Sequence, residues 1–504
     1  MTGTEYTAIC AEKTPRHTRK ENNSMVEKIY LIAPEKIGTI NPDIYGVFAE
    51  HIGGVIYDGI YCGDKAENVR GFRKEIIEKL KAIRTPLVRW PGGCFAETYD
   101  WRDGVGPKEK RPTRINWWTE NDGRYEPNLV GTDEFLDFCS LVGAEPYFAA
   151  NMTSASPRDI RDWVDYVNSP EGSTTYAKLR AGNGHPAPYN VKLWGVGNEN
   201  WGGGGNMTPE YYAGEYRRYA EVMANASKGL ELIGCGACDF DYGWTRRVLG
   251  ELSKKYVRMS GLSFHFYCGT AGGSVNFTDE EWNQLIDRAG KMQELIDRHW
   301  AAAVSYGLEN SAKLVIDEWG CWHHDNTDLV AENHLFEQQS TMRDAVVTAL
   351  TLNIFNNNCE KIRLCAVAQL VNNLHALFLA HEDKCFCTPT YHVFDMYKEH
   401  MGAEAVSVAA PDGVSASASV KDGMMTVTLA NLTPDRDIEV SLEALGFDAG
   451  KKAEIITLGD GDIHAHNTFD EPEKVMPGCE SAEDFDGRLT LVRGSVASVR
   501  FAVV

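Results

Sequence analysis

The sequence predicts an α/β protein in which a (β/α)8 TIM barrel precedes a C-terminal antiparallel, jelly-roll-like β-sandwich. Two observations lead to this fold class. From about residue 44 to residue 402, short apolar segments rich in β-branched residues alternate with helical patterns. After residue 402 the helical patterns stop, and segments of alternating polarity follow, as is typical of antiparallel strands.

The first region contains eight candidate strands in series, each followed by a helical pattern. The candidate strands span residues 44–51, 87–92, 145–151, 191–199, 231–237, 261–267, 313–318 and 360–370. The candidate helices span residues 72–83, 133–142, 157–167, 209–226, 243–256, 279–306, 333–356 and 390–400. Eight such units are typical of a closed barrel. A doubly wound sheet is the alternative, but no glycine-rich first turn supports it, and residues 202–205 lack the strand–turn–helix context of a nucleotide loop.

The remaining segments divide the chain into further parts. The β-sandwich is expected over residues 403–504, with strands at 414–420, 424–429, 438–442, 453–458, 489–492 and 496–503. Asp422-Gly423 favours a hairpin turn between the first two of these strands. Residues 25–43 contain a strand candidate that we expect to join the sandwich, ahead of a barrel at 44–402. Residues 1–24 have no apolar core and are expected to form a disordered extension, not a secretory signal.

Composition excludes several classes of partner. The 504 residues are 43% hydrophobic and 24% charged, as in ordinary globular proteins. A net charge of −22 argues against nucleic acid and anionic membranes, which need clustered cations. No stretch reaches the ~18 apolar residues of a membrane span. Thirteen cysteines without framework spacing indicate a reducing compartment, so a cytoplasmic location is expected.

Two glutamates end apolar strand candidates and are the main functional signal. Glu199 ends the fourth strand and Glu318 ends the seventh. Active sites of such barrels lie at the C-terminal ends of the strands. Glycoside hydrolysis needs a carboxyl group that protonates the leaving oxygen and a second that attacks carbon or activates water. A single strand-end glutamate is as readily an ion pair or loop cap, whereas two on one rim favour a catalytic pair.

Other polar residues lie at or just past the predicted strand ends: Glu50, Arg89, Cys94, Asn198, His265, Tyr267 and Gln369. Arg89 can keep a strand-end carboxylate ionised, and Asn198 can orient a sugar hydroxyl. Because side chains alternate along a strand, His265 and Tyr267 face the same way, so both are candidate substrate-binding residues, and the Tyr267 hydroxyl can also bond the nucleophile. Packing in the core is the alternative for both.

Aromatic and metal-binding motifs are less specific. Trp201, Trp319 and Trp322 flank the two glutamates, where indoles can cover the apolar face of a sugar or pack in the core. His323-His324-Asp325 resembles a metal-ligand cluster, but adjacent residues rarely converge on one ion. Cys235-Gly236-Ala237-Cys238 lacks a second pair and is more simply part of a core strand. No Gly-x-Ser-x-Gly segment supports a serine hydrolase.

Several motifs, in order along the chain, resemble the family 51 glycoside hydrolases, the intracellular α-L-arabinofuranosidases. The matching stretches are Tyr45-Gly46-Val47-Phe48-Ala49-Glu50-His51, Arg89-Trp90-Pro91-Gly92-Gly93-Cys94-Phe95, Trp101-Arg102-Asp103-Gly104-Val105-Gly106-Pro107, Gly131-Thr132-Asp133-Glu134-Phe135, Gly143-Ala144-Glu145-Pro146-Tyr147, Gly197-Asn198-Glu199-Asn200-Trp201-Gly202, His265-Phe266-Tyr267, Asp317-Glu318-Trp319 and Ala368-Gln369-Leu370-Val371-Asn372. The Asn-Glu pair alone is common to many barrel glycosidases, whereas the ordered set is specific.

The resemblance implies a retaining double displacement with Glu199 as acid/base and Glu318 as nucleophile. It also implies that Arg89 supports the nucleophile and that six residues bind or line the substrate pocket: Glu50, Cys94, Asn198, Tyr267, Trp322 and Gln369. No cofactor or metal is implied, and a homo-oligomer, commonly a hexamer, is expected. The segment 114–120 aligns poorly, so either Trp117 or Trp118 could reach the pocket.

These observations predict an exo-acting, retaining α-L-arabinofuranosidase. Its expected substrates are oligosaccharides derived from arabinoxylan or arabinan. An endo-glucanase or xylanase on the same scaffold is the first alternative and would need an open groove. A non-catalytic carbohydrate-binding protein is the more distant one.

Overall fold

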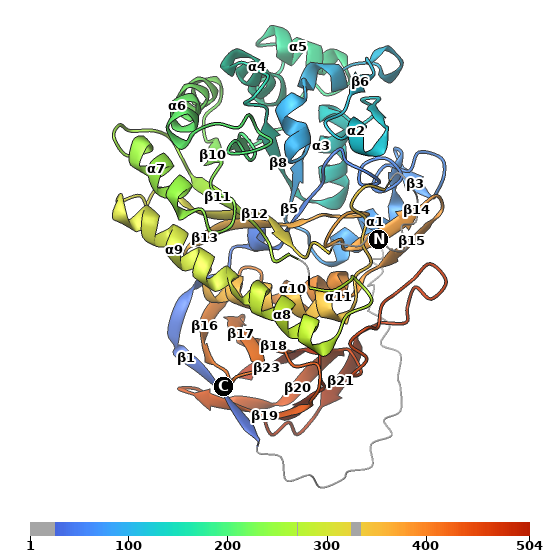
Figure 1. The fold of residues 1–504 in the computed structure, drawn as a ribbon, viewed down its shortest axis with the longest axis vertical. Helices are drawn as coiled ribbons and strands as arrows, with labels where there is room; N and C mark the ends of the chain where they lie inside the picture. Colours follow the sequence, from blue (N-terminus) through green and yellow to red (C-terminus); the bar gives the residue numbers. More distant parts are fainter. Residues whose placement is uncertain (1–25, 270, 324–333) are drawn as a thin grey trace, which may run out of the picture.

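In the computed structural model, residues 26–269, 271–323 and 334–504 are described. Figure 1 shows a barrel ringed by helices and, below it, a curved sheet built by the C-terminal part of the chain together with the N-terminal strand at residues 27–39. The predicted extension at residues 1–24 lies outside the described residues. Among the described helices, none combines the length and the hydropathy that a membrane-spanning segment needs.

Eight strands close into a parallel barrel in the order β10-β11-β12-β13-β2-β5-β8-β9. These strands are β2 (Gly46–Phe48), β5 (Leu87–Trp90), β8 (Glu145–Ala150), β9 (Leu193–Val196), β10 (Glu231–Gly234), β11 (Gly261–Tyr267), β12 (Lys313–Gly320) and β13 (Ile362–Ala368). The predicted fold class is therefore confirmed. Several strands are shorter than predicted, because their last polar residues turn into the loops of the C-terminal rim.

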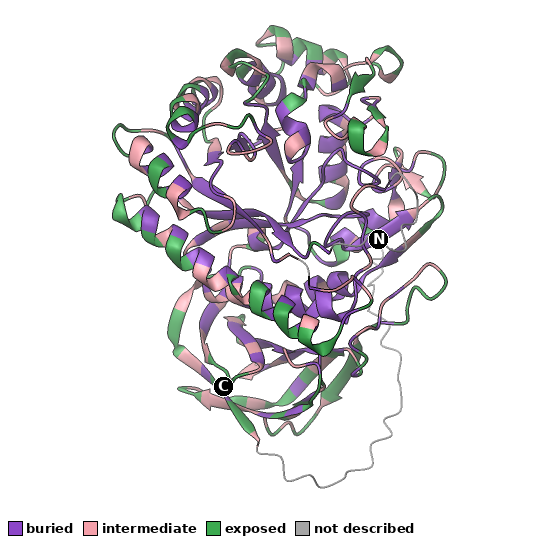
Figure 2. Cartoon of the chain, viewed as in Figure 1, coloured by how far each residue is buried: buried purple, intermediate pink, exposed green. Residues whose placement is uncertain are grey.

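Most helices surround the barrel, bury one face against it and expose the other (Figure 2). The helix Met342–Asn357 is instead buried on nearly all sides, and the short helix Thr119–Asp122 has no buried residue. The described chain has eleven α-helices in all. They are α1 (Lys74–Ala82), α2 (Thr119–Asp122), α3 (Thr132–Val142), α4 (Pro157–Asn168), α5 (Thr175–Gly182), α6 (Pro209–Ala226), α7 (Tyr242–Leu252), α8 (Asp279–Gly290), α9 (Met292–Ser305), α10 (Met342–Asn357) and α11 (Pro389–Tyr397).

Two predicted helices were wrong in extent. The pattern at 279–306 forms two helices, α8 and α9. Gly290 is a weak helix former, and Lys291 ends the first helix and begins the second. The pattern at 333–356 contains a helix that begins only at Met342. Thr341 caps this helix, and Asp344 completes a capping box with it. Helix α5 was not predicted.

The C-terminal sheet has nine strands in the order β21-β20-β23-β18-β17-β16-β1-β19-β22. They are β1 (Glu27–Thr39), β16 (Glu404–Ala409), β17 (Val414–Lys421), β18 (Met424–Asn431), β19 (Ile438–Leu445), β20 (Ala449–Leu458), β21 (Gly478–Ala482), β22 (Arg488–Leu491) and β23 (Val496–Val503). Strand β1 lies between β16 and β19 and runs parallel to β19, unlike the antiparallel pairing expected throughout. Apolar residues from both halves of the sheet share one core.

Helix α10 joins the barrel to this sheet. Its asparagines reach across to β17: Asn353 and Asn356 bond the hydroxyls of Ser415 and Ser417. His400, in the short helix after α11, bonds hydroxyls of β17 and β18. Because these polar side chains are largely buried, the hydrogen bonds fix how the two parts meet.

Short elements extend the loops of the barrel. They are η1 (Pro42–Tyr45), η2 (Cys94–Thr98), η3 (Trp101–Gly104), η4 (Lys108–Lys110), η5 (Lys398–His400), β3 (Asn68–Val69), β4 (Phe72–Arg73), β6 (Arg114–Ile115), β7 (Tyr125–Glu126), β14 (Phe378–His381) and β15 (Lys384–Cys387). Those after β2, β5 and β13 lie on the C-terminal rim of the barrel and shape its entrance.

Candidate active site

Glu199 and Glu318 face each other at the C-terminal rim of the barrel. Glu318 lies within β12, and Glu199 lies just beyond the end of β9. One carboxyl oxygen of each lies within 4.8 Å of the other, and His265 stands between them. His265 Nδ1 is 2.8 Å from Glu199 Oε1 and 3.4 Å from Glu318 Oε2. The structure thus brings together the two glutamates that the sequence singled out.

Glu318 is held by two donors. Arg89 Nη1 donates to Oε1 over 2.8 Å, and the Tyr267 hydroxyl donates to Oε2 over 2.9 Å. Burial raises the pKa of Glu318, the positive charges of His265 and Arg89 act against this, and the carboxyl group of Glu199 adds to it. The two donors therefore offset part of the cost of keeping a buried carboxylate ionised.

Beneath the pair lies a buried charge network centred on Asp317. Arg89 Nε is 3.4 Å from Asp317 Oδ2, His265 Nε2 is 3.1 Å from Oδ1, and the Tyr147 hydroxyl donates to Oδ2 over 2.8 Å. Burial alone would raise the pKa of Asp317, but Arg89 and His265 hold it below its ordinary value. The sequence suggested no role for Asp317. Its side chain lies below the rim, where it holds Arg89 and His265.

His265 carries a positive charge at neutral pH. Burial lowers its pKa, but Glu318, Asp317 and Glu199 outweigh burial and raise the pKa to about 10. Both ring nitrogens then carry protons, so Nδ1 donates to Glu199 and Nε2 to Asp317. His265 and Tyr267 point to the same side of β11, as alternation along the strand predicts.

The loop that carries Glu199 has a specialised backbone. Gly197 has a φ of +90°, and a Cβ there would lie 2.0 Å from Asn200 Oδ1. Glu199 itself has a φ of +44°, which is unfavourable for a residue with a side chain and needs support from its surroundings. The residue type at position 197 is therefore fixed by both the conformation and the available space.

That support comes from Glu97, which the sequence analysis missed. Its carboxylate is fully buried and accepts hydrogen bonds from the Asn198 backbone over 2.6 Å and from Asn200 Nδ2 over 3.0 Å. Its second oxygen accepts from the backbones of Met152 and Thr153. The acid follows the Gly92-Gly93-Cys94 stretch in the sequence, but no local spacing distinguishes it from a surface acid.

Asn198 and Gln369 are both oriented by protein hydrogen bonds. Asn198 Oδ1 accepts from Arg89 Nη2 over 2.6 Å, which leaves the buried Nδ2 without a partner in the described part of the chain. Gln369 Oε1 accepts from the Glu50 backbone over 3.0 Å. The amide of Asn198 is thus a donor available to a ligand.

Glu50 lies on the same rim beside the nucleophile candidate. Its Oε1 accepts from the Phe95 backbone over 2.9 Å and from Trp118 Nε1 over 3.1 Å. Burial, aided by the charge of Glu318, raises the pKa of Glu50 to about 7, although the Phe95 hydrogen bond acts in the opposite direction. Of the two neighbouring tryptophans that the sequence left open, Trp118 is the one that bonds Glu50.

Cys94 and Trp322 also border the site. The Cys94 sulfur is 3.9 Å from Glu199 Oε2, and burial together with the surrounding carboxylates raises the pKa of the thiol, which therefore stays protonated. The Trp322 ring centroid is 5.2 Å from that of Tyr267, and 37% of the residue is exposed. Trp322 is thus the aromatic residue placed at the edge of the site.

Two other candidates from the sequence are structural. Trp319 is buried and packs against Phe355 and Phe394 behind the barrel wall, so it does not face a sugar. His323 bonds Asp344 at the start of α10 over 2.9 Å. The other two residues of that predicted cluster, at 324 and 325, lie outside the described residues.

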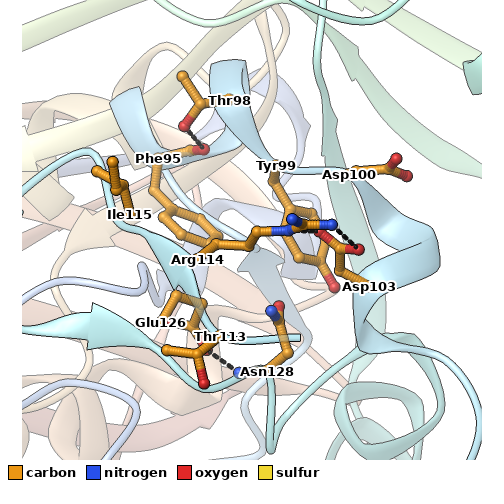
Figure 3. A pocket seen from close by; sticks show the side chains of 10 residues that line it. All are labelled: Phe95, Thr98, Tyr99, Asp100, Asp103, Thr113, Arg114, Ile115, Glu126 and Asn128. Carbon is orange, nitrogen blue, oxygen red and sulfur yellow. Dashed lines mark hydrogen bonds and ion pairs between the residues drawn. The ribbon is translucent and has the colours of Figure 1, made fainter. Parts of the chain in front are cut away.

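A hollow of about 590 Å³ is lined by Phe95 and by other residues of the segment between β5 and α3 (Figure 3). Arg114 crosses it and pairs with Asp103, its Nε lying 2.7 Å from Oδ2. Its remaining lining residues include Tyr99, Asp100 and Asn128, and neither catalytic candidate. The hollow is therefore separate from the carboxyl pair.

Comparison with known proteins agrees with this geometry. Residues 79–272 match the model described as "Alpha-L-arabinofuranosidase 1 domain", and residues 317–494 match "Alpha-L-arabinofuranosidase C-terminal domain". An intracellular exo-α-L-arabinofuranosidase of Bacteroides ovatus is 36% identical over 463 residues, covering 87% of this chain and 88% of the relative. The chain belongs to the α-L-arabinofuranosidases of glycoside hydrolase family 51.

Solved structures of this family superpose along nearly the whole arabinofuranosidase chain. The family 51 arabinofuranosidase of Xanthomonas axonopodis pv. citri is 35% identical, with a TM-score of 0.88 over 94% of this chain and 99% of that one. The α-L-arabinofuranosidase of Thermotoga maritima, solved as an arabinose complex, is 30% identical, with a TM-score of 0.81 over 95% and 100%. The barrel and the C-terminal sheet domain are therefore both shared with family 51 arabinofuranosidases.

Proposed function

We propose that this arabinofuranosidase is exo-acting and retaining, and that it releases terminal non-reducing α-L-arabinofuranosyl residues from oligosaccharides derived from arabinoxylan and arabinan. The observation that carries the proposal is the approach of the Glu199 and Glu318 carboxyl oxygens to within 4.8 Å. Retaining glycosidases hold their two carboxyl groups about 5–5.5 Å apart, whereas inverting enzymes leave about 6.5–9.5 Å for a water molecule.

In the first step Glu318 attacks the anomeric carbon while Glu199 donates a proton to the leaving oxygen. A glycosyl ester forms on Glu318, and the leaving alcohol departs. In the second step Glu199 takes a proton from water, which attacks the same carbon and frees Glu318. Two inversions give net retention. The hydrogen bonds from Arg89 and Tyr267 support this assignment because they stabilise Glu318 as an anion, both before attack and as it leaves.

The surrounding polar atoms are placed to hold the arabinofuranosyl ring. Asn198 Nδ2 has no protein partner in the described chain, so it can donate to a sugar hydroxyl. Glu50 has one oxygen engaged by Phe95 and Trp118, which leaves the other for a hydroxyl. We assign the same role to Gln369 and Cys94, while Trp322 covers the edge of the ring. His265 positions the glutamates from below.

Three further properties are proposed from the relatives and the family. The Bacteroides ovatus relative is named an intracellular exo-acting enzyme, which supports terminal cleavage and a cytoplasmic location for this one. A homo-oligomer, a hexamer by resemblance to the family, is also proposed. Light scattering, which measures the molar mass in solution, tests it. The mechanism uses only carboxyl groups and water, so no cofactor is proposed.

The stereochemistry of azide products tests the mechanism. Parent enzyme should hydrolyse 4-nitrophenyl α-L-arabinofuranoside, and both Glu318→Ala and Glu199→Ala should be slow. Azide should rescue Glu318→Ala by replacing the nucleophile and give the β-azide, whereas it should rescue Glu199→Ala by trapping the ester and give the α-azide. Azides of the opposite configurations would reverse the roles of the two glutamates.

The same assay separates the alternatives. An endo-glucanase or xylanase would leave the arabinoside intact and cut internal bonds of a polysaccharide, which a fall in viscosity detects. A carbohydrate-binding protein would bind arabino-oligosaccharides without turnover, and both glutamates could then be lost without effect on that binding. Release of free arabinose without a fall in viscosity is the result that the proposal requires.

A further inference from the structure

Outside the carboxyl pair, two histidines and an aspartate converge where three rim loops meet. Asp58 lies in the loop after β2, His334 in the segment after β12, and His381 at the end of β14. Asp58 Oδ2 is 2.7 Å from His381 Nδ1 and 3.4 Å from His334 Nε2, and all three atoms lie within 4.8 Å of one another. These side chains come from loops joined to the first, seventh and eighth strands of the barrel.

We propose that Asp58, His334 and His381 form a structural binding site for a divalent transition-metal ion, best matched by zinc. Two imidazole nitrogens and one carboxylate oxygen are ligands that zinc prefers. Bonds of about 2.0–2.2 Å arranged tetrahedrally place ligand atoms about 3.3 Å apart, so small side-chain rotations suffice to reach that spacing. Water would complete the coordination on the exposed side of His381, whose side chain is 34% accessible.

The nitrogen of His334 that faces Asp58 supports this interpretation. His334 is completely buried, and its Nε2 has no hydrogen-bond partner in the described part of the chain. This buried nitrogen faces the Asp58 carboxylate as an ion pair but without a well-formed hydrogen bond, and an ion shared by the two atoms would satisfy both. The same atom, 3.4 Å from the Asp58 oxygen, is at ligand spacing for a shared ion.

A second shell already orients the ligands. His334 Nδ1 bonds Glu337 Oε2, so Nδ1 carries a proton, and Nε2, which faces Asp58, is the nitrogen that would give up its proton to bind an ion. This carboxylate–histidine pair is the arrangement commonly found behind metal-bound imidazoles. The other Asp58 oxygen accepts from the Glu382 backbone over 3.0 Å and lies 3.4 Å from Lys65 Nζ, so the Asp58 carboxyl group is fixed in orientation.

Local packing also keeps the His334 ring in place. A Cβ at Gly54 would lie 2.5 Å from the ring, so the glycine allows the backbone to approach it closely. Phe336, two residues after His334, packs against Trp322 and Trp118 with ring centroids 5.1 Å and 5.8 Å apart. An ion at this position would therefore anchor one wall of the sugar pocket without touching the carboxyl pair.

A second group of possible ligands, Cys321, His323 and Asp344, fits a metal ion less well. Asp344 already accepts hydrogen bonds from Thr341 and His323. Arg343 Nη2 lies 3.3 Å from His323 Nδ1 and donates to it, so both ring nitrogens of His323 already have partners. The group contains a thiol, which gives it a spectroscopic signature that the proposed site lacks.

Metal content and affinity test the proposal independently of activity. Full-length enzyme is stripped with a chelator, and Zn²⁺ is then titrated in competition with a chromophoric chelator, with bound zinc counted by mass spectrometry. One tightly bound zinc per chain is expected for the parent enzyme and for the control His466→Ala, whose ring contacts the His464 carbonyl elsewhere. His381→Ala and Asp58→Asn should lose this ion, and Glu337→Gln should bind it about 10–100-fold more weakly.

Two further measurements hold even if a variant folds poorly. Co²⁺ bound to the stripped parent should give weak visible bands without a thiolate charge-transfer band. Zinc should raise the midpoint of thermal unfolding of the parent by mass action, but not that of His381→Ala. Absence of tight zinc binding by the parent, equal affinity in His381→Ala, or a thiolate band would each overturn the proposal.

Discussion

Replacing Tyr267 by phenylalanine isolates one hydrogen bond to Glu318, the proposed nucleophile. The hydroxyl donates to Glu318 Oε2 over 2.9 Å, and phenylalanine keeps the ring that packs against Trp322. The bond favours the ionised form of Glu318. Its loss must therefore raise the pKa of Glu318 and move the acidic limb of the pH–rate profile to higher pH.

The size of the shift follows from the strength of the bond. A hydrogen bond to a charged group contributes about 1.5–3 kcal/mol, and one pH unit corresponds to about 1.36 kcal/mol. The acidic limb of kcat/KM should thus move up by about 1–2 pH units in Tyr267→Phe. Because kcat/KM reports the free enzyme, the profile is measured with 4-nitrophenyl α-L-arabinofuranoside well below KM.

A matched control is Tyr212→Phe, which removes a buried hydroxyl that bonds the Val196 carbonyl and touches no carboxyl group. Its profile should keep the position of the parent limb even if stability falls. An unmoved acidic limb in a folded Tyr267→Phe enzyme, or a limb moved to lower pH, would refute the reasoning that this bond holds Glu318 ionised.

Three other changes test separate parts of the structure. Glu199→Ala should slow hydrolysis of arabino-oligosaccharides far more than hydrolysis of aryl arabinosides, because nitrophenolate leaves without help from an acid. Equal losses of rate on the two substrates in steady-state assays would exclude the acid role. Gly197→Ala should lower the free energy of unfolding by about 1–3 kcal/mol in denaturant titrations, because the new Cβ would clash with Asn200 and the φ of +90° disfavours a side chain. An unchanged denaturant concentration at the midpoint of unfolding would contradict this. Glu50 has a pKa of about 7 when folded and an ordinary value of 4.5, so the folded enzyme holds this proton more tightly and loses stability as pH rises through that window. Glu50→Gln should lack this loss, so the free energies of unfolding of the parent and the variant should diverge by ~3 kcal/mol by pH 8. Parallel pH dependences of stability in the two proteins would argue against a raised pKa of Glu50.

The sequence predicted the barrel because the pattern repeats eight times and each strand is apolar throughout. Once the strands are parallel and closed, their C-terminal ends meet on one rim, so Glu199 and Glu318 converge without further information. The same rule brought Glu50, Arg89 and Gln369 to the site. These residues were predictable because their position depends on strand order alone.

Other parts of the site depend on contacts that no local pattern records. Glu97 supports the Glu199 loop through a short helix that returns beneath it. Asp317 reaches the same Arg89 and His265 as Glu318 because the register of β12 shifts at these residues, and no sequence pattern records that irregularity. The start of α10 is different, since the Thr341 and Asp344 capping box is readable in the sequence and outweighs the apolar pattern before it. Long-range contacts explain the first two misses, and neglected cap chemistry explains the third.

The surroundings of the two glutamates differ in the way that their proposed roles require. Glu318 is part of a strand, its side chain is 7% accessible, and both of its oxygens accept hydrogen bonds from the protein. Glu199 lies beyond its strand in a loop, and its side chain is 19% accessible. A nucleophile must be held rigidly, because attack requires a fixed distance to carbon, and Glu318 is also shielded from water. An acid/base must reach both the leaving oxygen, to which it gives a proton in the first step, and the incoming water, from which it takes one in the second. The more accessible carboxyl group therefore suits Glu199 to that role and not to the other.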